Sequence, residues 1–171
     1  MIVYHGSNVE VEKADVSHSR KNVDFGKGFY VTTVKEQAIN WCMRFKRRKE
    51  NAIISIYDLD EKRIEKYKVL EFKDYSEDWI DFILKCRSGE DNTDYDIVMG
   101  GVANDKVFNT VELFLDGLID KLEAIKRLKY EKPNYQIAFR TQNSIDDLLR
   151  FKGSEILWTQ IQYYYRWSMQ E

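Results

Sequence analysis

Residues 24–33 read Asp-Phe-Gly-Lys-Gly-Phe-Tyr-Val-Thr-Thr, and this stretch decides the fold. Gly26 and Gly28 stand one residue apart, and glycine permits tight turns and close backbone approaches that side chains forbid. Residues 29–33 are aromatic and β-branched, a composition typical of strands. The pattern predicts a turn that opens into a strand over 29–33, on which Tyr30 offers a flat ring to a ligand. A plain hairpin turn followed by a core strand fits the same residues.

A second motif, Tyr-His-Gly-Ser at residues 4–7, ends a short predicted strand near the N-terminus. Together with residues 24–30, it resembles the ADP-ribosyltransferase superfamily of the histidine–tyrosine–glutamate type. More narrowly, the chain is similar to a bacterial family of unknown function that is grouped with those transferases and marked by Asp-Phe-Gly-x-Gly-Phe-Tyr. The similarity continues through residues 95–98, 101–107 and 133–139, so that only the last stretch is unmatched.

This resemblance implies an α+β fold, ADP-ribosyltransferase-like, in which two small packed β-sheets form an NAD cleft with flanking helices. It implies an NAD-dependent mono-ADP-ribosyltransferase that releases nicotinamide and modifies a macromolecular acceptor, either a protein or a nucleic acid. A role as a bacterial or phage toxin or defence effector follows by analogy alone. Two alternatives remain open: an NAD glycohydrolase with water as acceptor, and a non-catalytic module that keeps the fold and binds NAD or a partner.

The resemblance also implies roles for the motif residues. The ring of His5 would bond a hydroxyl of the adenosine ribose, and the backbone of Gly6 would bond the nicotinamide amide. The ring of Tyr30 would stack on nicotinamide, an apolar contact that needs no charge. Without the family, His5 is equally a histidine satisfied at a strand end.

Gln136 stands where the superfamily has its glutamate. A glutamine amide can still accept a hydrogen bond from a ribose hydroxyl. It cannot supply the negative charge that a carboxylate places near an oxocarbenium ion. The departure puts glutamate-dependent chemistry in doubt, and a polar residue at the start of a strand is the plain alternative.

Four further residues complete the predicted NAD site. Gly28 belongs to the turn that approaches the ligand, and Ser7 offers a hydroxyl beside the first motif. Arg20 can clamp a pyrophosphate with two parallel hydrogen bonds. Thr32 shares a strand face with Tyr30 and can line the pocket. An exposed loop arginine is the alternative for Arg20.

Composition favours one globular domain over residues 1–171. Apolar residues make up 43% of the chain and the formal net charge is −2, so no global field draws it to nucleic acid or membrane. Cys42 and Cys86 lie in apolar helical patterns typical of buried thiols, and no cysteine–histidine spacing predicts a metal site. We expect a cytoplasmic protein without a membrane span, because Met1 runs directly into the first motif.

Hydrophobic periodicity predicts the remaining elements. Strands are expected at residues 2–4, 29–33, 52–59, 66–72, 96–99, 135–140 and 155–165. Helices are expected at residues 35–49, 76–87, 105–115, 120–129 and 144–149. The order lacks a regular alternation of strand and helix and carries no dinucleotide fingerprint, which favours an α+β fold over a Rossmann fold.

Two segments remain open to more than one interpretation. The basic run at residues 44–49 ends the predicted helix 35–49, where cations suit the helix dipole and usually face solvent. A landing patch for nucleic acid is the sharper alternative. The aromatic segment 163–167 can stack bases, dock a protein partner or close the core.

Overall fold

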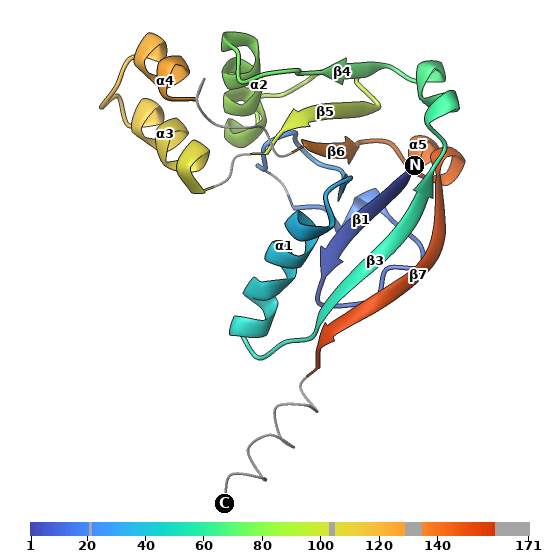
Figure 1. Cartoon of the computed structure of the whole chain (residues 1–171). Coiled ribbons are helices and arrows are strands. Elements are labelled where there is room, and N and C mark those ends of the chain that lie inside the picture. The colour runs from blue at the N-terminus through green and yellow to red at the C-terminus, as the bar shows by residue number, and fades with distance from the viewer. Residues whose placement is uncertain (21, 103–104, 129–134, 160–171) are drawn as a thin grey trace, which may run out of the picture.

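The structure is a computed structural model that describes residues 1–20, 22–102, 105–128 and 135–159 (Figure 1). Its strands are β1 (Ile2–Ser7), β2 (Phe29–Thr32), β3 (Ala52–Leu59), β4 (Val69–Glu71), β5 (Ile97–Gly101), β6 (Tyr135–Phe139) and β7 (Leu149–Trp158). Its helices are α1 (Lys35–Arg47), α2 (Glu77–Ser88), α3 (Asp105–Leu115), α4 (Lys121–Leu128) and α5 (Gln142–Leu148), with short 3₁₀ turns at Val16–His18 and Glu61–Lys66. The predicted α+β class is confirmed.

The strands form one mixed sheet in the order β4-β5-β6-β2-β1-β3-β7, instead of the two separate sheets that were expected. The β4–β5 pair is parallel and the other neighbours are antiparallel. The sheet is nevertheless weak at its centre, because β1 and β2 pair only at Tyr4 and Thr32. By contrast, β1 pairs with β3 along its whole length, from Ile2 to Ser7. The sheet therefore has two halves that share a single pairing.

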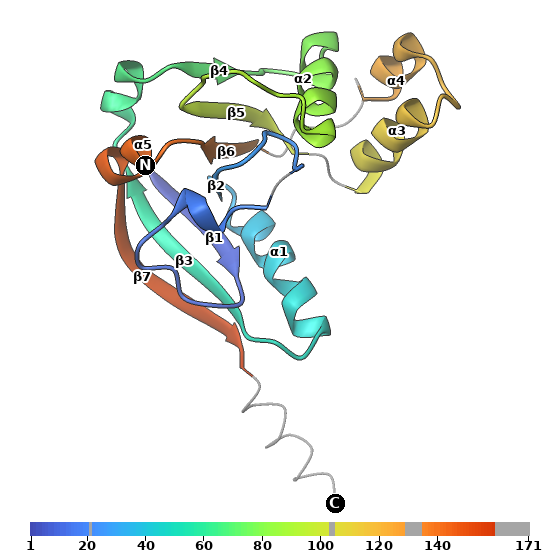
Figure 2. The same cartoon turned by 180° about the vertical axis from the view of Figure 1, so that it is seen from behind.

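Each half of the sheet has its own helical cover (Figures 1 and 2). Helix α1 packs on β1 and β3 through a small cluster that includes Ala38, Cys42 and Ile54. Helices α2, α3 and α4 lie at the other half, where Trp79 and Ile83 of α2 are fully buried. Both cysteines are buried and free, as the apolar patterns predicted. In the described part of the chain, no helix is long and apolar enough to cross a membrane.

Local sequence signals set most element ends. The Ser76 hydroxyl accepts a hydrogen bond from the Trp79 amide at the start of α2, and Asp120 does the same for Glu123 before α4. Strand β7 begins at Leu149, earlier than the predicted 155, because α5 ends at Leu148 and the chain pairs at once with Leu59 of β3. Residues 160–165 of the predicted strand and the aromatic segment 163–167 lie outside the described residues.

Candidate functional site

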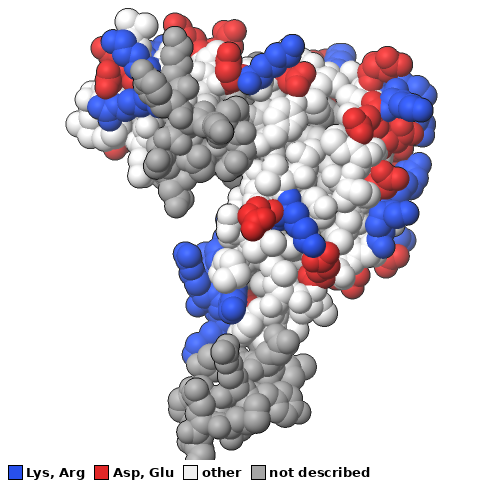
Figure 3. All heavy atoms as spheres, in the orientation of Figure 1, with Lys and Arg blue, Asp and Glu red and all other residues white. Residues whose placement is uncertain are grey.

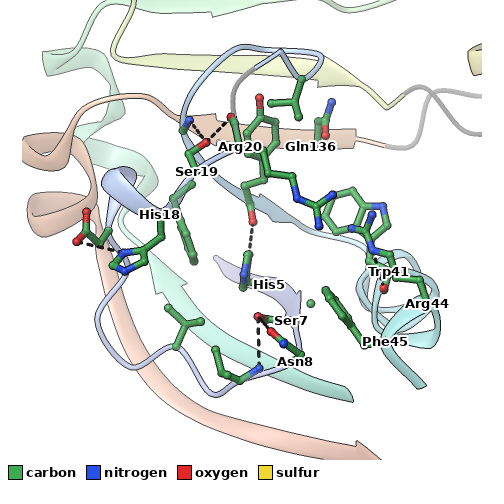
Figure 4. Close-up of a pocket in the computed structure, with 18 of the residues that line it drawn as sticks. His5, Ser7, Asn8, His18, Ser19, Arg20, Trp41, Arg44, Phe45 and Gln136 are labelled. Carbon is green, nitrogen blue, oxygen red and sulfur yellow. Dashed lines mark hydrogen bonds and ion pairs between the residues drawn. The ribbon is translucent and has the colours of Figure 1, made fainter. Parts of the chain in front are cut away.

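A cavity opens where β1 and β2 part, between the two halves of the sheet (Figure 4). Its volume of about 1130 Å³ lies slightly above the range that small-molecule sites span, about 300–1,000 Å³. It is lined by β1, by described residues of the loop between β1 and β2, by the start of β2 and by one face of α1. Arg87 of α2, Val102 and Glu112 of α3 line it as well. Gln136 of β6 contributes to the lining as well.

The His5 side chain stands where β1 and β2 separate. Its Nδ1 lies 2.7 Å from the Tyr30 carbonyl oxygen, and its ring stacks on Phe29 with centroids 4.4 Å apart. A carbonyl oxygen only accepts, so Nδ1 carries the proton and donates. The imidazole thereby occupies the place of a ladder hydrogen bond between the strands. In the neutral ring, Nε2 is left with a lone pair that can accept a hydrogen bond.

The charge state of His5 follows from its surroundings. Burial lowers the pKa of His5, and the nearby Arg44 guanidinium lowers it further, against the opposite effect of the bond to Tyr30. The ring is therefore neutral at pH 7, which keeps Nε2 available as an acceptor. This arrangement suits a ligand whose hydroxyl group donates a hydrogen bond to Nε2.

The Tyr30 side chain is bound inside the glycine turn. Its hydroxyl donates to the Gly26 carbonyl at 2.5 Å and accepts from the Phe25 amide at 3.1 Å. Burial raises the Tyr30 pKa, so the phenol stays protonated. Gly26 has a φ of +72°, a left-handed conformation that glycine adopts without strain. These two hydrogen bonds fix the Tyr30 side chain and the glycine turn relative to each other. The half-buried ring lines the cavity.

Close packing, as well as the cavity, accounts for the presence of glycine at positions 6 and 28. A Cβ on Gly28 would lie 2.7 Å from the Phe139 carbonyl oxygen, and one on Gly6 would lie 2.6 Å from the Ala38 carbonyl oxygen. The Gly28 amide donates to the Ser19 hydroxyl at 2.8 Å, which fastens the loop to the turn. Both glycines also line the cavity.

Gln136 is 3% exposed, and its Nε2 atom has no hydrogen-bond partner among the described residues. A buried amide without a partner is costly, because it loses its bonds to water and gains none in return. Gln136 also lines the cavity, so a ligand there can satisfy it. A half-turn of the amide exchanges oxygen and nitrogen, so the position can serve a donor or an acceptor.

The remaining predicted residues are divided between the cavity and the core. Ser7 and Arg20 line the cavity as expected. Thr32 does not: it is fully buried, its hydroxyl lies 2.9 Å from the Tyr135 carbonyl oxygen, and it accepts from the Val34 amide. Thr32 shares a face with Tyr30, but it sits at the single position where β1 and β2 still pair. The cavity does not extend to Thr32.

Helix α1 supplies residues that the sequence did not assign to the site. Trp41 and Phe45, expected on the core face with Ala38 and Cys42, are half-buried and line the cavity. Arg44 and Arg48, expected at a solvated helix end, line it too. The spacing of four residues within each pair was the available signal, since it places both members on one helix face.

Comparison with known proteins identifies the family. Residues 1–151 match the family described as "Protein of unknown function (DUF3990)", and the chain belongs to this family. No curated protein and no solved structure matches the chain. The family description names no activity.

Proposed function

We propose that the protein binds NAD⁺ in this cavity and transfers its ADP-ribose to a macromolecular acceptor, with release of nicotinamide. The observation that carries the proposal is the convergence of His5, Tyr30 and Gln136 in one cavity. They come from β1, β2 and β6, and they are the three positions that the resemblance to histidine–tyrosine–glutamate transferases singles out. An ADP-ribosyltransferase-like fold, with its sheet divided at β1 and β2, belongs to the same proposal.

The proposed reaction needs little acid–base catalysis. The bond between nicotinamide and ribose breaks, its electron pair leaves with nicotinamide as a neutral molecule, and positive charge develops on the ribose. A nucleophile of the acceptor then bonds to the same carbon and gives up its proton to solvent. The protein has to bend the dinucleotide, hold both leaving and accepting groups, and favour the charged transition state.

The cavity residues match these tasks. The neutral His5 ring offers Nε2 to a ribose hydroxyl, and the Tyr30 ring offers an apolar face to nicotinamide. Gln136 contributes an amide dipole rather than a charge, so it orients the ribose more than it stabilises the cation. Arg20 lies on the cavity wall with a guanidinium that suits a pyrophosphate.

The proposal is tested with labelled NAD⁺ and cell lysate, followed separately by protease and nuclease digestion. We expect free nicotinamide together with label on a macromolecule, and the digestion that releases the label identifies the acceptor class. Free ADP-ribose with no labelled macromolecule would replace transfer by hydrolysis. Binding of NAD⁺ without nicotinamide release in any lysate would support the non-catalytic module.

Two substitutions separate the structural bond of His5 from its action on the ligand. His5→Asn keeps an N–H near the position of Nδ1 and removes the acceptor at Nε2. We expect its NAD⁺ affinity to fall about tenfold, because one hydrogen bond to a buried group is lost. Both variants lose the stacking on Phe29, but His5→Asn keeps the bond to Tyr30 and should be the more stable of the two. His5→Gln keeps a polar atom near Nε2 and loses the bond to Tyr30. It should bind NAD⁺ better than His5→Asn and unfold more easily.

Calorimetric titration and thermal unfolding of both variants provide the measurement. Equal losses of affinity in the two variants would assign His5 to the fold alone.

A further inference from the structure

One face of α1 carries two pairs of side chains into the cavity. Trp41 and Phe45 form the aromatic pair, and Arg44 and Arg48 form the basic pair, each at a spacing of four residues. The two pairs lie side by side along the helix. Figure 3 shows basic side chains gathered over the C-terminal part of α1, although the chain as a whole carries a net charge of −2. We call these four residues the α1 wall.

Contacts within the α1 wall hold the cation beside the rings. The Arg44 Nε donates to the Trp41 carbonyl oxygen at 3.1 Å, and its Cζ lies 5.5 Å from the centroid of the Phe45 ring. Figure 4 shows Arg20 reaching from the loop toward Trp41. The α1 wall and Arg20 therefore present guanidinium groups and aromatic faces together, from the helix and from the loop before β2.

The cations of the α1 wall are crowded together with Arg20. Burial lowers the pKa of Arg44, and repulsion from Arg20 and Arg48 lowers it further. Within the described residues, no carboxylate forms an ion pair with any of these three arginines. Acidic side chains line the cavity at other positions, namely Glu10, Glu12, Asp15, Asp24, Glu50 and Glu112. An anion placed against the wall would relieve the repulsion.

We propose that the α1 wall binds a single-stranded nucleic acid, with Arg44 and Arg48 on phosphates and Trp41 and Phe45 against bases. Alternating cations and aromatic faces are the means by which proteins hold single strands, because phosphates recur along the strand and every base has a flat face. A duplex hides those faces in its stack and cannot enter a cavity. The inference rests on the proposed function, for which it names the acceptor class.

A dinucleotide alone explains the wall less well. A pyrophosphate needs one or two cations, and Arg20 already stands at the cavity for that purpose. The α1 wall adds two more guanidinium groups and two rings along one helix face. All four residues line the cavity, and Arg48 is the C-cap residue of α1.

The test measures fluorescence anisotropy of labelled oligothymidylate and oligouridylate, with a hairpin duplex for comparison, over a series of salt concentrations. Arg44→Gln and Arg48→Gln should each weaken binding of single strands and reduce the slope of log K against log salt by about one. Trp41→Ala should weaken it about tenfold, through lost stacking. Arg47→Gln is the matched control, because it removes the same charge from the same helix outside the cavity lining, and it should leave the slope nearly unchanged.

Parallel NAD⁺ titrations separate this inference from the proposed function. NAD⁺ binding without oligonucleotide binding would overturn the inference and leave the proposed function standing. Oligonucleotide binding without NAD⁺ binding would support nucleic-acid binding by the α1 wall and would overturn the proposed transferase function. Equal losses of oligonucleotide affinity in Arg47→Gln and Arg48→Gln would show only general charge attraction and would overturn the inference. In the experiment with labelled NAD⁺, label found on protein alone would identify protein as the acceptor and would also overturn it.

Discussion

Gly6→Ala is expected to lower the melting temperature by roughly 6–12 °C, which corresponds to about 3 kcal/mol for a chain of this size. The new Cβ would lie 2.6 Å from the Ala38 carbonyl oxygen and 3.0 Å from the Cys42 Sγ, so α1 would have to move away from β1. Backbone cannot yield as a flexible side chain does. Because α1 carries Trp41 into the cavity, NAD⁺ affinity should fall as well.

Ser7→Ala provides the control for Gly6→Ala. Ser7 is the next residue of β1, and its hydroxyl makes only long contacts of 3.4 and 3.5 Å with Val9 and Asn8. We expect a change of less than about 1 kcal/mol. Thermal unfolding of both variants gives the comparison. A melting temperature for Gly6→Ala equal to that of Ser7→Ala would show that α1 does not need the close approach.

Asp91→Ala is expected to destabilise the protein by about 3–5 kcal/mol, because it leaves the charge of Arg140 buried without a partner. The side chains of Asp91 and Arg140 form an ion pair and are 5% and 12% exposed. The pair lies beneath the glycine turn: a Cβ on Gly26 would lie 3.5 Å from Asp91 and 3.7 Å from Arg140. Loss of the pair should therefore loosen the turn that holds Tyr30.

The double variant Asp91→Leu/Arg140→Met is the matched control. It removes both charges and should be more stable than Asp91→Ala, since no buried charge is left alone. Acid provides a second test. Burial raises the pKa of Asp91, but the bonds from Thr93 and the charge of Arg140 outweigh it and lower the pKa below its usual value. The stabilisation is therefore present above the unfolded pKa and is lost as the pH falls through the folded pKa.

Urea unfolding at neutral and acid pH measures both effects. The account predicts that the stability difference between wild type and Asp91→Ala shrinks as the pH falls. A difference that is constant over this range would show that the pair contributes no charge-dependent stability.

The local motifs of the chain were predictable because their physics is local. The turn at Gly26, the strand that begins at Phe29 and the cap at Ser76 each depend on neighbours in the sequence. The positions of His5 and Tyr30 followed from the same motifs, and the cavity contains both.

Other features depended on contacts between distant segments. Periodicity placed Trp41 on one stripe with Cys42, but it could not show that the stripe is divided, with Cys42 in the core and Trp41 at the cavity. Strand alternation placed Thr32 on the face of Tyr30, but it could not show where β1 and β2 separate. Where the strands have separated, the imidazole of His5 bonds the carbonyl of Tyr30.

The most direct test of the proposed NAD⁺ site is calorimetric titration of Gln136→Met beside Gln37→Met. Both glutamines are buried and have an Nε2 atom without a partner among the described residues, but only Gln136 lines the cavity. The account predicts saturable binding of NAD⁺ to wild type, about tenfold weaker binding to Gln136→Met without loss of stability, and unchanged affinity in Gln37→Met. Absence of saturable NAD⁺ binding to the wild type, or equal affinities in all three proteins, would contradict it.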